Sequence, residues 1–144
     1  MRNRVAVLHG VNLNTLGRRP AQHYGTLSLP ELERRIEQFA RELVLEARFF
    51  HSNHEGEYVE EIHKARDYAD GLLLNPGAWT HYAWSLRDAV EVSGLPAVEV
   101  HLSDVEHREP FRHVSVFDGV RVAKVSGKGV EGYKDALDAL RDAL

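Results

Sequence analysis

Side chains able to do acid–base chemistry stand in short polar segments that each follow an apolar run. In the first of these segments, Arg19 and Tyr24 are five residues apart. A phenol is a poor base near neutral pH, but a guanidinium a few ångströms away favours the phenolate. The pair is therefore a candidate general base with its activator. The alternative is a surface tyrosine beside a solvated arginine.

A second pair of this kind is Glu99 and His101. Residues two apart on a strand share a face, so the carboxylate and the imidazole are expected to point the same way. A carboxylate beside an imidazole selects its tautomer and favours the imidazolium, which makes the histidine a better proton donor. Ser103, just beyond, is placed to hold a hydroxyl or carboxylate of a ligand. An ordinary structural Glu–His pair at a strand end is the competing interpretation.

Two further segments carry groups suited to binding. Asn75, Thr80 and His81 offer neutral donors and acceptors for sugar-like hydroxyls. Arg108 and Arg112 are four residues apart, so on a short helix they would share one face and form a fork for an anionic group. The alternatives are a turn with a helix N-cap for the first segment and a solvated charged turn for the second.

Two suggestive motifs are set aside. The run Gly127-Lys-Gly-Val-Glu-Gly132 matches G-x-G-x-x-G, but no strand follows it to supply a ribose-binding acid. We interpret it as a tight strand-to-helix turn. Among the nine histidines, His51 and His54 are three residues apart, yet no H-E-x-x-H or comparable ligand set is present. We therefore expect no metal site.

Composition narrows the class of protein. A chain of 144 residues fits one domain of ordinary size. Its net charge of -4 and pI near 6.1 argue against a broad nucleic-acid surface, so no nucleic-acid partner is expected. The absence of cysteine excludes disulfides and thiol nucleophiles and is compatible with a cytoplasmic location. No run approaches the length of a membrane span, and we expect no membrane partner.

The candidate acid–base and binding side chains must be positioned by the strands and helices that the apolar patterns predict. Ser28-Leu-Pro-Glu31 is a capping-box pattern that starts the clearest helix. We expect strands at 5–8, 47–51, 71–74, 97–100 and 120–125, and helices at 29–44, 59–69, 82–93 and 133–144. This alternation predicts an α/β fold: one domain, residues 1–144, with a doubly wound sheet of five parallel strands and helices on both faces.

In open sheets of this kind, ligands bind beyond the carboxyl ends of the strands, at the point where the strand order reverses. The segments that follow the first four expected strands are 9–25, 52–56, 75–81 and 101–113, and all are rich in Asn, His, Arg and Ser. We therefore expect the candidate residues to converge on one site.

Longer motifs run through nearly the whole chain, from about Val5 to Leu140. They are Gly10-Val-Asn-Leu13, Leu16-Gly-Arg-Arg19 with Tyr24-Gly25, Ser52-Asn-His-Glu-Gly-Glu57, Leu74-Asn-Pro-Gly-Ala78 with Thr80-His81 and Leu86-Arg-Asp88, and Glu99-Val-His-Leu-Ser103 with Arg108 and Phe111-Arg-His113. In this order they resemble the type II 3-dehydroquinate dehydratases, flavodoxin-like enzymes of the shikimate pathway. The chain departs from the family pattern at His9, Val11, Pro20 and Asp104.

The resemblance implies loss of water from 3-dehydroquinate to give 3-dehydroshikimate, with no cofactor. By resemblance, Tyr24 removes a proton alpha to the ketone and Arg19 keeps it ionised. Asn12 helps to hold the water that stabilises the developing oxyanion. His101, oriented by Glu99, protonates the departing hydroxyl.

The resemblance also implies how substrate is held and how the chain assembles. The substrate-binding residues it implies are Asn75, His81, Leu102, Ser103, Arg108 and Arg112. Asp88 reaches the site from a neighbouring subunit in a dodecamer built from trimers. Two other classes of function stay open on the residues alone: a non-catalytic flavodoxin-like module that binds a cyclic polyhydroxy acid, and metal-dependent hydrolysis by the histidines.

Overall fold

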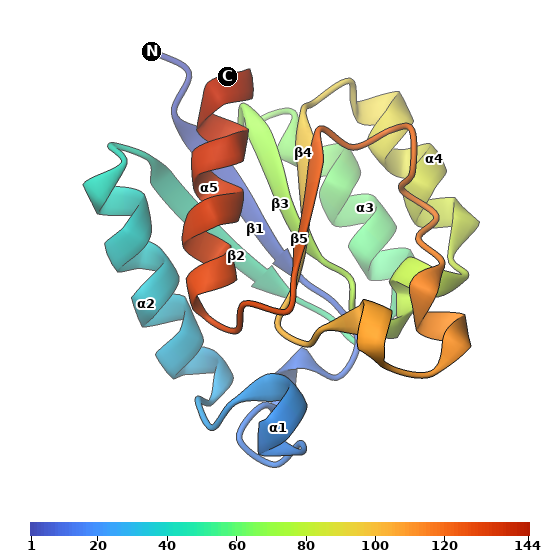
Figure 1. The fold of residues 1–144 in the computed structure, drawn as a ribbon. Coiled ribbons are helices and arrows are strands. Elements are labelled where there is room, and N and C mark those ends of the chain that lie inside the picture. The colour runs from blue at the N-terminus through green and yellow to red at the C-terminus, as the bar shows by residue number, and fades with distance from the viewer.

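The computed structural model describes residues 1–144 and contains one five-stranded, all-parallel sheet (Figure 1). The strands are β1 (Arg4–His9), β2 (Glu46–His51), β3 (Gly71–Asn75), β4 (Ala97–His101) and β5 (Ala123–Ser126), in the spatial order β2-β1-β3-β4-β5. The predicted doubly wound α/β fold is confirmed. The fifth strand was expected from residue 120 but begins at Ala123, because the chain turns repeatedly between Ser115 and Arg121.

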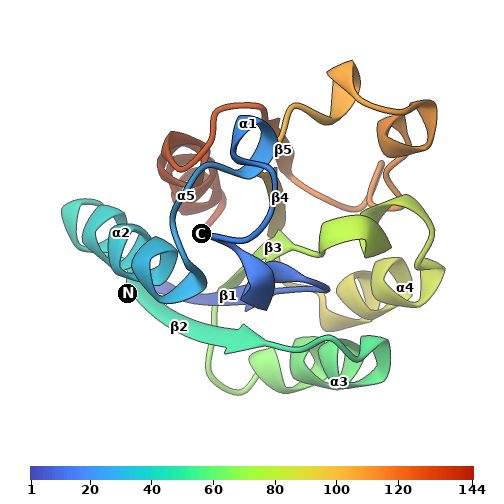
Figure 2. The ribbon, with the colours of Figure 1, turned by 90° about the horizontal axis from the view of Figure 1, so that it is seen from below.

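Helices cover both faces of the sheet (Figure 2). The helices α2 (Leu29–Glu42) and α5 (Glu131–Ala143) lie on one face, and α3 (Glu55–Ala65) and α4 (Trp84–Ser93) lie on the other. The helix expected from residue 82 begins at Trp84, because residues Gly77–His81 form a separate 3-10 helix and Tyr82 is its C-cap. No helix is both long and apolar enough to cross a membrane.

The core has two layers because the central strands are apolar on both faces. Val5 and Val7 of β1 pack with Ile36 of α2 on one side. Ala6 and Leu8 of the same strand pack in the other cluster, against α3 and α4. Burying each of the larger side chains contributes about 1.5–3 kcal/mol. Two-sided burial explains the continuous apolar runs of β1 and β3 and makes their carboxyl ends firm supports.

The start of α2 follows directly from its sequence. The Ser28 hydroxyl accepts a hydrogen bond from the Glu31 backbone N–H, and the Ser28 N–H donates to the Glu31 carboxylate. The predicted capping box is therefore confirmed. The glycine motif at residues 127–132 is likewise the predicted turn: Gly127 and Gly129 have φ of 77° and 56°, and α5 begins two residues later at Glu131.

The strand order reverses between β1 and β3, so this is the switch point of the sheet. The segments that follow β1, β3 and β4 gather at the lower end of the sheet in Figure 1. None of the helices expected from the sequence lies in the opening segment, residues 9–25, but this segment contains a 3-10 helix at Leu13–Thr15 and the short α1 at Ala21–Tyr24. Leu13 and Leu16 are buried and attach this segment to the core.

Candidate active site

One pocket lies at the carboxyl edge of the sheet and draws on three segments. The opening segment, the turn after β3 and the segment after β4 supply its lining: Leu13, Arg19, Tyr24, Asn75, Gly77, Ala78, His81, His101, Leu102, Ser103, Val105 and Arg112. Residues far apart in sequence are therefore brought together at the position that the strand order predicts.

Two guanidiniums hold the hydroxyl of Tyr24. Its oxygen accepts hydrogen bonds from Arg19 Nη2 at 2.7 Å and from Arg108 Nη1 at 2.6 Å. The Arg19 guanidinium also lies over the Tyr24 ring, 3.7 Å from its centroid. Burial lowers the pKa of Arg19 from its ordinary value. The Tyr24 oxygen therefore lies between two cations.

The predicted fork of Arg108 and Arg112 on one short helix is wrong. Arg108 is extended, with φ of -119°, between two separate 3-10 helices, and Pro110 starts the second of them. Arg112 lines the pocket, whereas Arg108 turns to the Tyr24 hydroxyl and to Ser103 Oγ at 3.3 Å. Arg108 therefore belongs with Arg19 as a second partner of the tyrosine.

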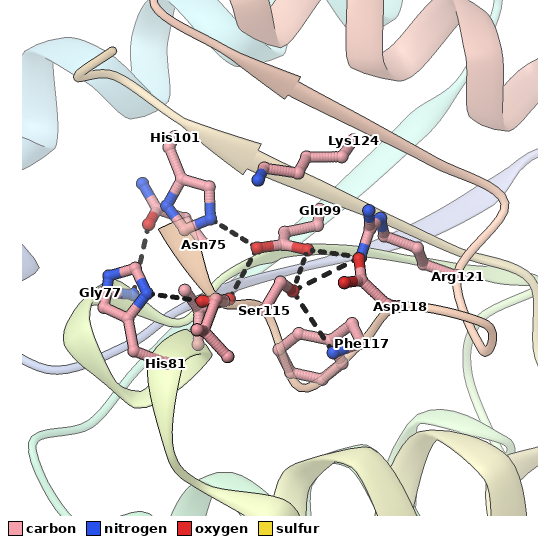
Figure 3. Close-up of polar contacts among 12 residues, drawn as sticks. Asn75, Gly77, His81, Glu99, His101, Ser115, Phe117, Asp118, Arg121 and Lys124 are labelled. Atoms are coloured by element: carbon pink, nitrogen blue, oxygen red, sulfur yellow. Dashed lines mark hydrogen bonds and ion pairs between the residues drawn. The ribbon is translucent and has the colours of Figure 1, made fainter. Parts of the chain in front are cut away.

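Glu99 is fully buried behind His101 (Figure 3). Its Oε2 atom accepts hydrogen bonds from His101 Nε2 and Thr80 Oγ1, both at 2.6 Å, and Oε1 accepts one from Ser115 Oγ at 2.7 Å. Burial acts to raise the pKa of Glu99, but the bonds from His101, Thr80 and Ser115 outweigh it and hold the pKa at about 2. Glu99 is therefore a fixed anion that orients the imidazole of His101.

Asn75 and His81 present polar groups from the turn after β3. The Asn75 amide donates to the Tyr133 hydroxyl at 2.9 Å and its carbonyl accepts from the Gly77 N–H. His81 Nδ1 donates to the Val114 carbonyl at 2.7 Å, and burial lowers the pKa of His81. The lowered pKa favours the neutral imidazole, and with Nδ1 donating to Val114 its Nε2 can accept a hydrogen bond from a ligand.

Comparison with known proteins agrees with this geometry. The sequence matches the family model Dehydroquinase class II over residues 3–141. The chain belongs to this family. A 3-dehydroquinate dehydratase of Halothermothrix orenii is 49% identical over 138 residues, covering 96% of this chain and 93% of the relative.

Solved structures carry the same family name. The crystal structure of a type II dehydroquinase from Butyrivibrio crossotus has a TM-score of 0.92 and 38% identity, covering 97% of this chain and 98% of that one. A type II dehydroquinase from Propionibacterium acnes has a TM-score of 0.90 and 37% identity, covering 99% and 98%. The predicted family resemblance is confirmed, and the flavodoxin-like sheet is that of the type II dehydroquinases.

Several residues predicted for the dehydroquinase site do not line the pocket of this chain. Asn12 is exposed, has φ of 69° and donates its backbone N–H to Asn53 Oδ1 at 2.8 Å. Asp88 is exposed on α4. Glu99 and Arg108 lie outside the lining: Glu99 contacts His101, and Arg108 contacts Tyr24.

The sequence analysis missed three side chains that support this pocket. Tyr133 reaches Asn75 from α5, and Ser115 and Arg121 reach Glu99 from the chain before β5. In the sequence, Tyr133 occupies an ordinary apolar position of a helix. Ser115 and Arg121 lie in a segment without periodicity, so only the three-dimensional fold brings them to Glu99.

Proposed function

We propose that this chain dehydrates 3-dehydroquinate to 3-dehydroshikimate, a hydro-lyase step of the shikimate pathway. The observation that carries the proposal is the pairing of opposite chemistries in one pocket. Tyr24 carries two guanidiniums at its oxygen, and His101 has a buried carboxylate behind it. Elimination of water from a hydroxy ketone needs a base for the proton alpha to the ketone and an acid for the departing hydroxyl. The cations beside Tyr24 suit it to be the base, and the anion beside His101 suits it to be the acid.

In the proposed reaction, the Tyr24 phenolate takes the proton from the carbon alpha to the ketone. The electron pair of that C–H bond forms an enolate, and Arg19 and Arg108 stay beside the newly protonated phenol. Preorganised donors around the enolate oxygen lower the barrier, and a water held by Asn12 is the proposed donor. Asn12 has its side chain free for this, since its observed contact with Asn53 uses the backbone N–H.

The second step expels the hydroxyl. The imidazolium of His101 donates its proton to the departing oxygen, the C–O bond breaks and water leaves as the enolate electrons form the new double bond. His101 Nε2 is engaged by Glu99, so Nδ1 is the atom assigned to this transfer. Moving one proton from Tyr24 to His101 through solvent restores the starting state. The acid and the base act on opposite sides of the bond, an anti elimination.

The remaining lining residues are assigned to substrate binding. Arg112 provides a cation for the substrate carboxylate, because guanidinium and carboxylate form strong charge-assisted hydrogen bonds. Asn75, His81 and Ser103 are assigned to the ring hydroxyls, and the backbone N–H of Leu102 is a further donor near the carboxylate. All five residues line the pocket.

We also propose that the chain works as a dodecamer of trimers in which Asp88 serves a neighbouring site. Asp88 and Trp84 are four residues apart on α4, share one face, and are exposed. Trp84 has 60% of its surface exposed, as expected for an aromatic side chain covered by a second subunit. Sedimentation tests the assembly, and a monomeric protein with full activity would contradict it.

The function is tested by adding 3-dehydroquinate to the purified protein in the presence of a chelator. Dehydration creates a conjugated enone, which is followed by its ultraviolet absorbance. Tyr24→Phe should abolish the absorbance rise, whereas Tyr68→Phe, a matched change of a tyrosine that contacts Glu61 outside the pocket, should not. Saturable binding without turnover would favour the binding module. Turnover that disappears only with chelator would favour metal-dependent chemistry.

A further inference from the structure

An arginine lies behind the carboxylate of Glu99 and is not used in the proposed mechanism. Arg121 Nη1 is 3.3 Å from Glu99 Oε1, and its side chain is only 17% exposed. The same nitrogen donates to Ser115 Oγ at 3.3 Å and lies 2.5 Å from Asp118 Oδ1. In Figure 3, Arg121 and His101 lie on opposite sides of Glu99.

We propose that Arg121 is a positioning residue that sets the proton affinity of His101 through Glu99, and that Asp118 opposes it. The inference rests on the proposed function, in which His101 is the acid. In this proposal, the segment between the 3-10 helix at Pro110–His113 and β5 adjusts the pKa of His101 to the pH at which the enzyme works. A general acid is most effective when its pKa lies near that pH.

The argument is a row of alternating charges. Protonated His101, Glu99, Arg121 and Asp118 are positive, negative, positive and negative, and each lies within 3.3 Å of the next. The charge of Glu99 stabilises the imidazolium, and Arg121 cancels part of that charge at the other carboxylate oxygen. Asp118 in turn cancels part of the charge of Arg121. Removing Arg121 must therefore make His101 easier to protonate, and removing Asp118 must make it harder.

Other charged and titratable groups surround His101 and Glu99. His81 stacks on the His101 ring with centroids 6.5 Å apart, and Lys124 of β5 is in register with Glu99 and pairs with Glu106 at 3.3 Å. The remaining groups line or border the pocket: Arg112, Arg19, Arg108 and Tyr24. None of them is altered in the variants below, so a difference between variants reports the row through Arg121.

The test compares the pH dependence of kcat/KM for dehydration in the wild-type protein and four variants. Arg121→Met should move the high-pH limb, where His101 loses its proton, upward by about one pH unit, as expected for a nearby unit charge at an effective dielectric of about 20. Asp118→Asn should move it downward by less, because the Asp118 side chain is 69% exposed. Arg121→Lys should leave it near the wild-type position. The control is Arg141→Met, which makes the same charge change at the Asp138 contact on α5.

A second readout needs no turnover. The imidazole of His101 is titrated by NMR in the free protein, with its signal assigned by its loss in His101→Gln. If the wild-type protein has no dehydratase activity, the proposed function fails, while the titration still reports on Arg121. Opposite shifts in Arg121→Met and Asp118→Asn support the proposal. An unchanged titration in both overturns it, and if Arg121→Met does not fold, Asp118→Asn decides by the presence or absence of its downward shift.

Discussion

The buried carboxylate of Glu99 makes the stability of the fold depend on pH in a calculable way. Its pKa is about 2, against an ordinary value of 4.5. A carboxyl with a depressed pKa contributes stability above its unfolded pKa, and this stability is lost as the pH falls toward its folded pKa. A difference of about 2.5 pH units corresponds to roughly 3 kcal/mol. The contribution should be complete above about pH 5, and by pH 3 about 2 kcal/mol of it should be gone.

The perturbation that isolates this contribution is Glu99→Gln, which keeps the side-chain shape but cannot ionise. The free energy of unfolding of both proteins is measured by urea titration from pH 3 to pH 7, at one protein concentration because assembly contributes to stability. The advantage of the wild-type protein over the variant should shrink by about 2 kcal/mol between pH 5 and pH 3. Ser93→Ala, which removes a hydroxyl that bonds only to the backbone of Val90 and Leu95, serves as the control with a pH-independent difference. A wild-type advantage that stays constant over this range would refute the reasoning about Glu99.

Two further changes test the supports of the site. Gly10→Ala places a Cβ 2.4 Å from the Pro76 carbonyl oxygen, so it should cost about 1–3 kcal/mol of unfolding free energy and displace Asn75, which urea titration and a dehydration assay will detect together. Ser28→Ala removes the cap of α2 and should cost about 1 kcal/mol in urea titration with kcat unchanged. A fully stable Gly10→Ala protein, or a Ser28→Ala protein as stable as wild type, would contradict these accounts.

The regular elements could be predicted from the sequence because their causes are local. The apolar run of β1 needs two buried faces, and the Ser28–Glu31 pair can satisfy itself within one helical turn. The pairing of Glu99 with His101 was also predictable, since two residues on one strand must share a face. Such features depend only on spacing along the chain.

The irregular chain between β4 and β5 was predicted less well because its path depends on distant partners. Arg108 was expected to pair with Arg112, but it bonds to Tyr24, 84 residues away in sequence. Arg121 and Ser115 lie in irregular chain and contact a carboxylate that other elements bury. No spacing along the chain carries that information. Such polar side chains are oriented by the buried partner that they contact, and that partner is known only from the three-dimensional fold.

The two chemical halves of the pocket stand on supports of very different depth. His101 and Glu99 end a strand whose residues are all buried, whereas α1, which carries Tyr24, buries none of its residues. Opening free energies rise with buried contact, so amides at residues 21–25 should exchange with solvent at far lower free energy than those of β4. Local opening of the segment that carries Tyr24 would therefore give a ligand access to the pocket while His101 stays in position. Such opening would expose only the Tyr24 side of the pocket.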